Sequence, residues 1–97
     1  MNSLQRALEL NREKDRTGIM FTKAHSAWDK FVAILSDKIS RKGCDHNYVE
    51  TRKTLYVHIE PKYDISISDA KTITYLRKYG GYCDCEILLN VVHNPNI

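Results

Sequence analysis

The most regular pattern of hydrophobic and polar residues lies between residues 22 and 42, where apolar side chains recur every three or four positions. These positions are Ala24, Ala27, Trp28, Phe31, Ile34, Leu35 and Ile39. Steps of three and four place side chains on one face of an α-helix. Thr22 suits the cap at the start of such a helix, and Gly43 suits a left-handed residue at its end. We therefore predict that residues 19–43 hold the main core helix.

Two further helices are predicted on either side. A weakly apolar helix over residues 4–15, ended by Gly18, forms an N-terminal helical extension over residues 1–18. Ser68 caps a third helix that runs to about Tyr79, where two consecutive glycines stop it. Its expected inward positions are Ala70, Ile73 and Leu76.

The segment before the third helix has an alternating pattern. Within residues 54–59, Leu55, Val57 and Ile59 alternate with Thr54, Tyr56 and His58. Alternation of β-branched and aromatic residues predicts a short strand. A helix from Tyr48 to Ile59 is the alternative, and Pro61 is expected to end either element.

A second short element is predicted near the C-terminus. Residues 87–92 are largely apolar, which fits a buried strand or one to two turns of helix. As a strand, this segment would pair with residues 54–59. We therefore expect an α+β fold, a single domain over residues 1–97 with three helices and a short two-stranded β element. Residues 44–92 form its motif-bearing half, and residues 93–97 form a loose tail.

The composition is that of one small soluble domain, with 97 residues of which 42% are hydrophobic and 28% charged. The N-terminus lacks the basic start and apolar core of a secretory signal, and no stretch reaches the roughly 18 apolar residues of a membrane span. We therefore expect a cytoplasmic protein that does not bind membranes. In a reducing compartment, cysteines are expected as thiols or metal ligands rather than disulfides.

The net charge of +3 is unevenly distributed. Residues 1–43 carry nine Lys and Arg against five Asp and Glu, whereas residues 44–97 carry six against seven. This excess falls short of the basic stripe of a dedicated nucleic-acid-binding protein. Three basic doublets with tyrosines nearby are candidate contacts for nucleic acid or phosphate, although solvated helix ends explain them as well. They are Arg41 and Lys42, Arg52 and Lys53, and Arg77 and Lys78.

All three cysteines lie in two short clusters at predicted helix ends. Cys44 and His46 follow Gly43, and Cys83 and Cys85 follow the paired glycines. Zinc takes four ligands in a tetrahedral array, and three thiolates with one imidazole form a standard structural set. The one-residue spacing within each pair is tight, so the backbone between the two ligands must be extended or turned. We predict a zinc ion held by these four side chains.

Other interpretations of the clusters stay open. The cysteines can be small buried side chains beside a hydrogen-bonded or exposed His46. A redox pair is a third interpretation, although a disulfide between Cys83 and Cys85 would close a small, strained ring. His58 and His93 are reserve ligands in case His46 is not used.

Polar residues beside the clusters are expected to support the site. Asp45 and Asp84 lie inside the two pairs and are expected to bond backbone amides rather than metal. Glu86 follows Cys85 directly, so its carboxylate is a candidate acid/base for a metal-bound water. That role needs an open coordination position, which four protein ligands would close. We therefore favour a binding protein over an enzyme.

On these residues, the chain resembles an uncharacterised family of small bacterial proteins, classed only as a domain of unknown function. Members carry a C-x-H-x4-T segment, here Cys44 to Thr51, and an ending similar to GGYCDCEVLxNV, here Gly80 to Val91. The resemblance covers about the C-terminal half and implies no activity. This chain departs from the family pattern in two places: the stretch between Thr51 and the paired glycines is longer and more strand-like, and an N-terminal helical region is added. The motif positions that it implies are Cys44, His46, Thr51, Cys83, Cys85 and Glu86, which adds Thr51 to the supporting residues.

Together these features predict a small intracellular module with a structural Cys3His zinc site and a binding or regulatory role. The expected partner is a protein rather than a nucleic acid. Two alternatives belong to other functional classes. One is a metal- or thiol-dependent enzyme that uses Glu86, and the other is a nucleic-acid or phosphate-ligand binder that uses the basic doublets.

Overall fold

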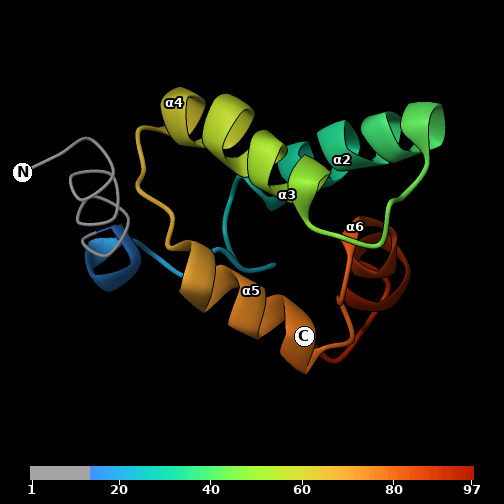
Figure 1. Ribbon diagram of the computed structural model, residues 1–97. Helices are drawn as coiled ribbons and strands as arrows, with labels where there is room; N and C mark the ends of the chain where they lie inside the picture. Colours follow the sequence, from blue (N-terminus) through green and yellow to red (C-terminus); the bar gives the residue numbers. More distant parts are fainter. Residues whose placement is uncertain (1–13) are drawn as a thin grey trace, which may run out of the picture.

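Residues 14–97 are described by the structure, a computed structural model, and every regular element among them is helical (Figure 1). The elements are α2 (Trp28–Lys42), α3 (Val49–Lys53), η1 (Thr54–Ile59), α4 (Glu60–Tyr63), α5 (Asp69–Lys78), α6 (Asp84–Glu86) and η2 (Ile87–Val91), where η denotes π-helix. Residues 14–17 are also helical. The rest of the helix expected over residues 4–15 lies outside the described residues.

The predicted α+β fold is wrong, because residues 14–97 contain no strand and no sheet. Their one isolated β-bridge is parallel and joins Ile19 to Ile67. The N–H of Ile19 donates to the carbonyl of Ser66 at 2.8 Å, and the N–H of Ser68 donates to the carbonyl of Ile19 at 2.8 Å. This bridge attaches the segment before α2 to the start of α5.

Residues 54–59, predicted as a strand, form the π-helix η1 in the middle of one continuous helix, α3–η1–α4. The alternating pattern was misleading because burial does not follow it. Leu55 and Ile59 are buried, whereas Val57 between them is 62% exposed. Thr51, one turn before Leu55, is also fully buried, so the buried positions recur in steps of four. The helical alternative for this segment is the correct one.

Pro61 does not end this helix, contrary to the prediction. The helix continues to Tyr63 and is followed by Asp64 in the left-handed conformation, with a φ of 52°. The N–H of Glu60 donates to the carbonyl of Leu55, five residues back. We attribute the tolerance of Pro61 to this wider turn, since a proline ring clashes with the carbonyl four residues back in a regular α-helix.

The start of α2 also differs from the prediction, because the helix begins at Trp28 and not after Thr22. The hydroxyl of Thr22 accepts a bond from the N–H of Ala24 at 3.3 Å within a turn. Just before it, Phe21 is fully buried and donates its N–H to the hydroxyl of Thr72 at 3.0 Å. The contact with α5 holds this segment away from the axis of α2.

Other helix ends lie where the sequence predicted them. Gly43 follows α2 with a φ of 78°, and Gly80 follows α5 with a φ of 89°. The hydroxyl of Ser68 caps α5 by accepting a bond from the N–H of Lys71 at 3.1 Å. Of the expected inward positions of α5, Leu76 is buried, Ile73 is partly buried and Ala70 is exposed. Residues 87–91 form the π-helix η2 rather than a strand, and Val92 follows in a turn.

The helix α3–η1–α4 packs along α2, and α5 lies across the core from this pair (Figure 1). Short helix α6 contacts the ends of α2 and α3. The tail is attached through Lys23, whose ammonium donates to the carbonyls of Val91, Val92 and Asn94. None of the described helices has both the length and the apolar character that a membrane span requires. The arrangement brings the C-terminal end of α2 beside α6, where the two cysteine clusters meet.

Candidate metal centre

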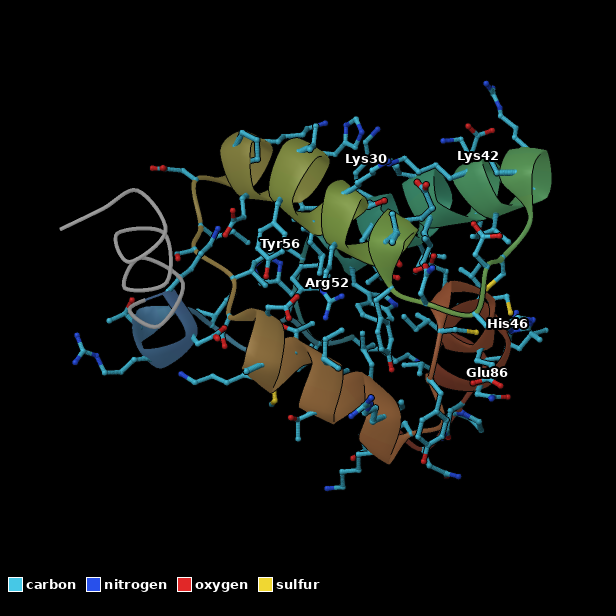
Figure 2. The ribbon with its side chains drawn as sticks, in the orientation of Figure 1. Lys30, Lys42, His46, Arg52, Tyr56 and Glu86 are labelled. Carbon is cyan, nitrogen blue, oxygen red and sulfur yellow. The ribbon has the colours of Figure 1, made fainter. Side chains whose placement is uncertain are left out.

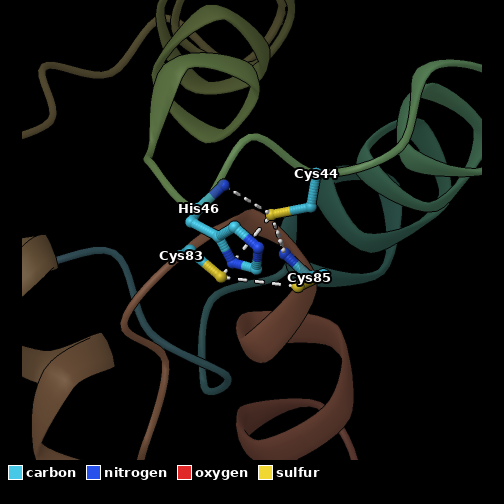
Figure 3. Close-up of side chains that lie close together, drawn as sticks. All are labelled: Cys44, His46, Cys83 and Cys85. Carbon is cyan, nitrogen blue, oxygen red and sulfur yellow. Dashed lines mark hydrogen bonds between the residues drawn. The ribbon is translucent and has the colours of Figure 1, made fainter.

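The four predicted metal ligands converge on one point (Figure 3). One ligand atom from each of Cys44, His46, Cys83 and Cys85 lies within 4.8 Å of the other three. The two clusters are separated by 37 or more positions in the chain, and the sulfurs of Cys44 and Cys83 nevertheless lie 3.5 Å apart. Cys83 and Cys85 bring their sulfurs to 3.4 Å. The fold therefore assembles one four-residue cluster from both ends of the motif-bearing half.

These separations match those of a tetrahedral metal site. Zinc–sulfur bonds of about 2.3 Å place two thiolates of a tetrahedron roughly 3.8 Å apart. The observed sulfur–sulfur distances are a few tenths of an ångström shorter, so a bound ion requires only a small outward movement of the side chains. The same distances are much longer than the bond of about 2.05 Å in a disulfide. The three cysteines are free thiols.

The first cluster is positioned by the end of α2. Gly43 turns the chain out of the helix in the left-handed region, where a residue without Cβ is favoured. His46 also has a positive φ, 61°, and its side chain is exposed. The sulfur of Cys44 accepts the backbone N–H of His46 at 3.3 Å. This local bond folds the loop so that both side chains point to the same side.

The second cluster is positioned by the glycine pair. A Cβ on Gly81 would lie 2.8 Å from Val91 and 2.9 Å from Ile87, so only glycine lets the chain pass this close to η2. Cys83 then adopts an extended conformation, with φ −158° and ψ 176°, and Cys85 lies in α6. The sulfur of Cys83 is therefore buried in the protein, whereas Cys85 is partly exposed.

Hydrogen bonds to Cys44 favour its ionised form. Burial alone would raise the pKa of its thiol, but the backbone N–H groups of Cys85 and His46 donate to the sulfur and together hold the pKa below the ordinary value. The neighbouring sulfurs of Cys44 and Cys83 raise the pKa of the Cys85 thiol to about 12. The Cys85 thiol therefore resists ionising beside the other two sulfurs, and a divalent cation at this point would remove the conflict.

Asp84, between the two C-terminal cysteines, joins the cluster to α3. Its side chain is 1% exposed and accepts the backbone N–H of Thr51 at 2.9 Å and the Thr51 hydroxyl at 2.6 Å. The other carboxylate oxygen accepts the N–H of Glu50 at 3.2 Å. Asp84 thus caps the first turn of α3 from a distant part of the chain. Thr51, a motif position, is one of the groups that it holds.

The two other acidic residues expected to support the site are placed differently. Asp45 is exposed. The carboxylate of Glu86 accepts the backbone N–H of Tyr82 at 3.2 Å, which closes a turn around Cys83 and Cys85. Glu86 is thus engaged by the backbone of its own loop and is not among the residues that converge on the candidate metal position.

Two residues that hold the clusters together were not singled out as site residues from the sequence. The hydroxyl of Tyr48, a buried residue, donates to the carbonyl of Gly81 at 2.7 Å. The carbonyl of Asn47 accepts the N–H of Asp84 at 2.9 Å. Both lie directly after His46, and this proximity is the one sequence signal that favours them. Asn47 and Gly81 take part through their backbone carbonyls, which every residue has, so the residue type does not reveal these bonds.

The remaining candidate residues lie elsewhere. His58, on η1, and His93, after η2, are exposed and outside the four-residue cluster. The basic doublets are divided among different carboxylates. Arg41 pairs with Asp37, Lys42 and Lys53 pair with Glu50, and Arg52 pairs with Asp69. Arg77 and Lys78 are exposed at the end of α5, with the ammonium of Lys78 over the ring of Tyr79.

Comparison with known proteins identifies a family but no activity. The family model described as "Protein of unknown function (DUF2695)" matches residues 31–90. This range includes both cysteine clusters, the helix α3–η1–α4 and α5. No curated protein and no solved structure matches the chain.

Proposed function

Because the chain belongs to this family of unknown function, its role must be derived from the site, and we propose that it is a zinc-binding module with a structural Cys3His centre. The observation that carries the proposal is the convergence of four ligand atoms, from two distant segments, to within 4.8 Å of one another. Only Cys83 of the three cysteines is buried, so burial of small apolar side chains does not account for the convergence of all four residues.

The donor set favours zinc over other metals. Three thiolates and one imidazole in a tetrahedral arrangement suit zinc, whereas calcium and magnesium prefer oxygen ligands. The single buried carboxylate at the site, Asp84, is engaged by Thr51 and Glu50 rather than directed at the sulfurs. Oxygen ligation by the protein is therefore not supported.

A structural role is favoured over a catalytic one. Four protein ligands fill a tetrahedral site, and an enzyme needs a position for water or substrate. The carboxylate of Glu86 bonds the amide of Tyr82, so the alternative acid/base role has no geometric support. The binding of nucleic acid through basic doublets is also weakly supported, since Arg41, Lys42, Arg52 and Lys53 lie beside carboxylates.

We assign the module to a reducing compartment, the cytoplasm, because three adjacent free thiols persist there. We propose a binding or regulatory role with a protein partner, because four protein ligands would leave no position on the ion for catalysis. Tyr82, 61% exposed and next to Cys83, is a suitable contact residue for such a partner, since aromatic side chains are enriched in protein interfaces.

Metal content tests the proposal. The protein purified without added metal is expected to contain about one zinc per chain by mass spectrometry, and Cys83→Ser is expected to lose it. Chelation should lower the melting temperature, because a metal that binds only the folded state stabilises it. If zinc contributes about 3 kcal/mol, the decrease is roughly 12–24 °C for a domain of this size.

Histidine variants provide the matched control. His46→Ala should lower zinc affinity, whereas His93→Ala, which removes an exposed histidine outside the cluster, should retain wild-type zinc content. Cobalt substitution then separates a structural from a catalytic site, since the visible spectrum of a closed Cys3His site does not respond to azide. A wild-type protein with no zinc, or with an unchanged melting temperature in chelator, would disprove the proposal.

A further inference from the structure

A second candidate site lies between α3–η1 and α5, away from the cysteines. It is a cleft of about 390 Å³ lined by Lys14, Asp15, Arg52, Tyr56 and Asp69. The lining residues come from the segment before Gly18, from α3–η1 and from the first position of α5. Figure 2 shows Arg52 and Tyr56 pointing from the α3–η1 helix toward α5. The volume lies in the range of small-molecule sites, which hold about 300–1,000 Å³.

The charges around the cleft balance. Two lining side chains are cationic, Lys14 and Arg52, and two are anionic, Asp15 and Asp69. Arg52 and Asp69 form a two-point pair, with N–O distances of 2.9 and 3.2 Å. Neither an anion nor a cation is favoured by such a lining, because each would meet a like charge. A small molecule that carries one charge of each sign would match it.

Both a cationic and an anionic side chain of the cleft can form further hydrogen bonds. The guanidinium of Arg52 has more N–H donors than its pair with Asp69 uses. One carboxylate oxygen of Asp15 accepts the N–H of Ala70 at 3.1 Å, which anchors the side chain at the start of α5. A ligand carboxylate at Arg52 and a ligand ammonium at Asp15 and Asp69 therefore need not displace these internal bonds.

Tyr56 gives the cleft an aromatic surface. Burial and the nearby carboxylates of Asp69 and Glu60 raise the pKa of its hydroxyl, so the ring stays neutral. The ammonium of Lys14 lies 4.3 Å from the ring centre and 2.7 Å from Glu60. The ring face thus already accepts a cationic group, from a lysine side chain that is 36% exposed.

The π-helix provides an independent indication that this surface has a function. A π-helical turn is rare and is frequently found at functional sites. η1 spans Thr54–Ile59 and contains Tyr56, so one lining residue of the cleft belongs to this widened turn.

We propose that this cleft binds a small zwitterion, namely a free amino acid with an aromatic side chain. Its carboxylate bonds Arg52, its ammonium bonds Asp15 and Asp69, and its ring stacks on Tyr56. This site is independent of the zinc proposal. Contacts nevertheless link it to the candidate metal centre. The guanidinium of Arg52 lies 5.6 Å from the ring centre of Tyr48, and the hydroxyl of Tyr48 donates to the carbonyl of Gly81.

The test is a titration of the isotope-labelled full chain, as purified, with L-phenylalanine and detection by amide NMR. Two probes that each lack one charge are titrated in parallel, phenethylamine and 3-phenylpropanoate. L-Phenylalanine is expected to give saturable shifts at Asp15, Arg52, Tyr56 and Asp69, with a dissociation constant on the order of 1 mM for so small a ligand. Each half-charged probe is expected to bind at least about 10-fold more weakly, because one charged pair is left unmatched.

Charge variants sharpen the test. Asp69→Asn leaves two cations and one anion and should improve binding of 3-phenylpropanoate. Arg52→Gln leaves one cation and two anions and should improve binding of phenethylamine. Arg77→Gln removes an exposed cation of α5 outside the cleft and should bind all three probes as the wild type does.

Three outcomes would overturn the inference. The first is an absence of saturable shifts with L-phenylalanine up to about 20 mM, well above the expected constant. The second is equal binding of the three probes, and the third is shifts confined to residues outside the cleft. Spectra of each variant without ligand confirm that it is folded before binding is compared.

Discussion

Asp84 is the residue through which the candidate metal centre and the helical core depend on each other. It lies between two candidate ligands, and its buried carboxylate accepts three hydrogen bonds from Glu50 and Thr51. Hydrogen bonds to a charged acceptor contribute more than neutral ones, about 1.5–3 kcal/mol each at most sites. A loss of this carboxylate is therefore expected to affect both stability and metal binding.

We predict that Asp84→Ala lowers the free energy of unfolding by about 3 kcal/mol, because the buried amide and hydroxyl of Thr51 lose their acceptor. Zinc affinity should fall roughly 10-fold or more, since the backbone between Cys83 and Cys85 loses its anchor. Denaturant unfolding and competition with a chromogenic chelator measure the two effects.

The matched control is Asp45→Ala, at the equivalent position of the first pair. Asp45 is exposed, so its replacement should change stability by no more than about 0.5 kcal/mol. Equal effects of the two variants would show that Asp84 has no special role in the fold.

Among the helices, η1 is a segment in which core packing outweighs the preference of its residues for a strand. Its sequence, Thr-Leu-Tyr-Val-His-Ile, is rich in residues that favour strands. Leu55 and Ile59 nevertheless pack into the core on one side of a helix, and Val57 is left exposed. Burial of two large side chains against α2 outweighs propensities that differ by only about 1 kcal/mol.

Helix α5 depends on a cap that the sequence did predict. Ser68→Ala should lower the free energy of unfolding by about 1 kcal/mol, because the N–H of Lys71 loses its side-chain acceptor. Thermal unfolding followed by circular dichroism measures the change. Ser36→Ala, at an exposed position inside α2, is the control and should be close to neutral. A neutral effect of Ser68→Ala would contradict the assigned role of this cap.

At the scale of the whole molecule, the candidate metal centre lies where three separate helices meet. Cys44 follows α2, Cys83 precedes α6, and Asp84 bonds the start of α3. A bound ion would therefore fasten the end of α2 to α6 and, through Asp84, to α3. Helix α5 is anchored instead by its bridge to Ile19 and by the Ser68 cap.

This arrangement predicts an uneven response to metal removal. Chelation should accelerate amide hydrogen exchange in residues 43–53 and 81–91, well below the melting temperature of the metal-free protein. Residues 69–78 should change less, because their anchors do not involve the cluster. Exchange followed by mass spectrometry measures the pattern, and a uniform increase along the chain would contradict it.

The sequence by itself determined which four residues form the candidate metal centre and where several helices end, because these features depend on residue type at single positions. Three cysteines and a histidine beside glycines indicate a metal site, Gly43 and Gly80 have positive φ angles that few other residues adopt, and the hydroxyl of Ser68 caps α5. Tertiary structure decided that residues 54–59 and 87–91 are helical and that Tyr48 and Asn47 hold the clusters together. Those outcomes depend on contacts between segments that are far apart in the sequence. The free energy of packing in the core selects them, and local conformational preference does not.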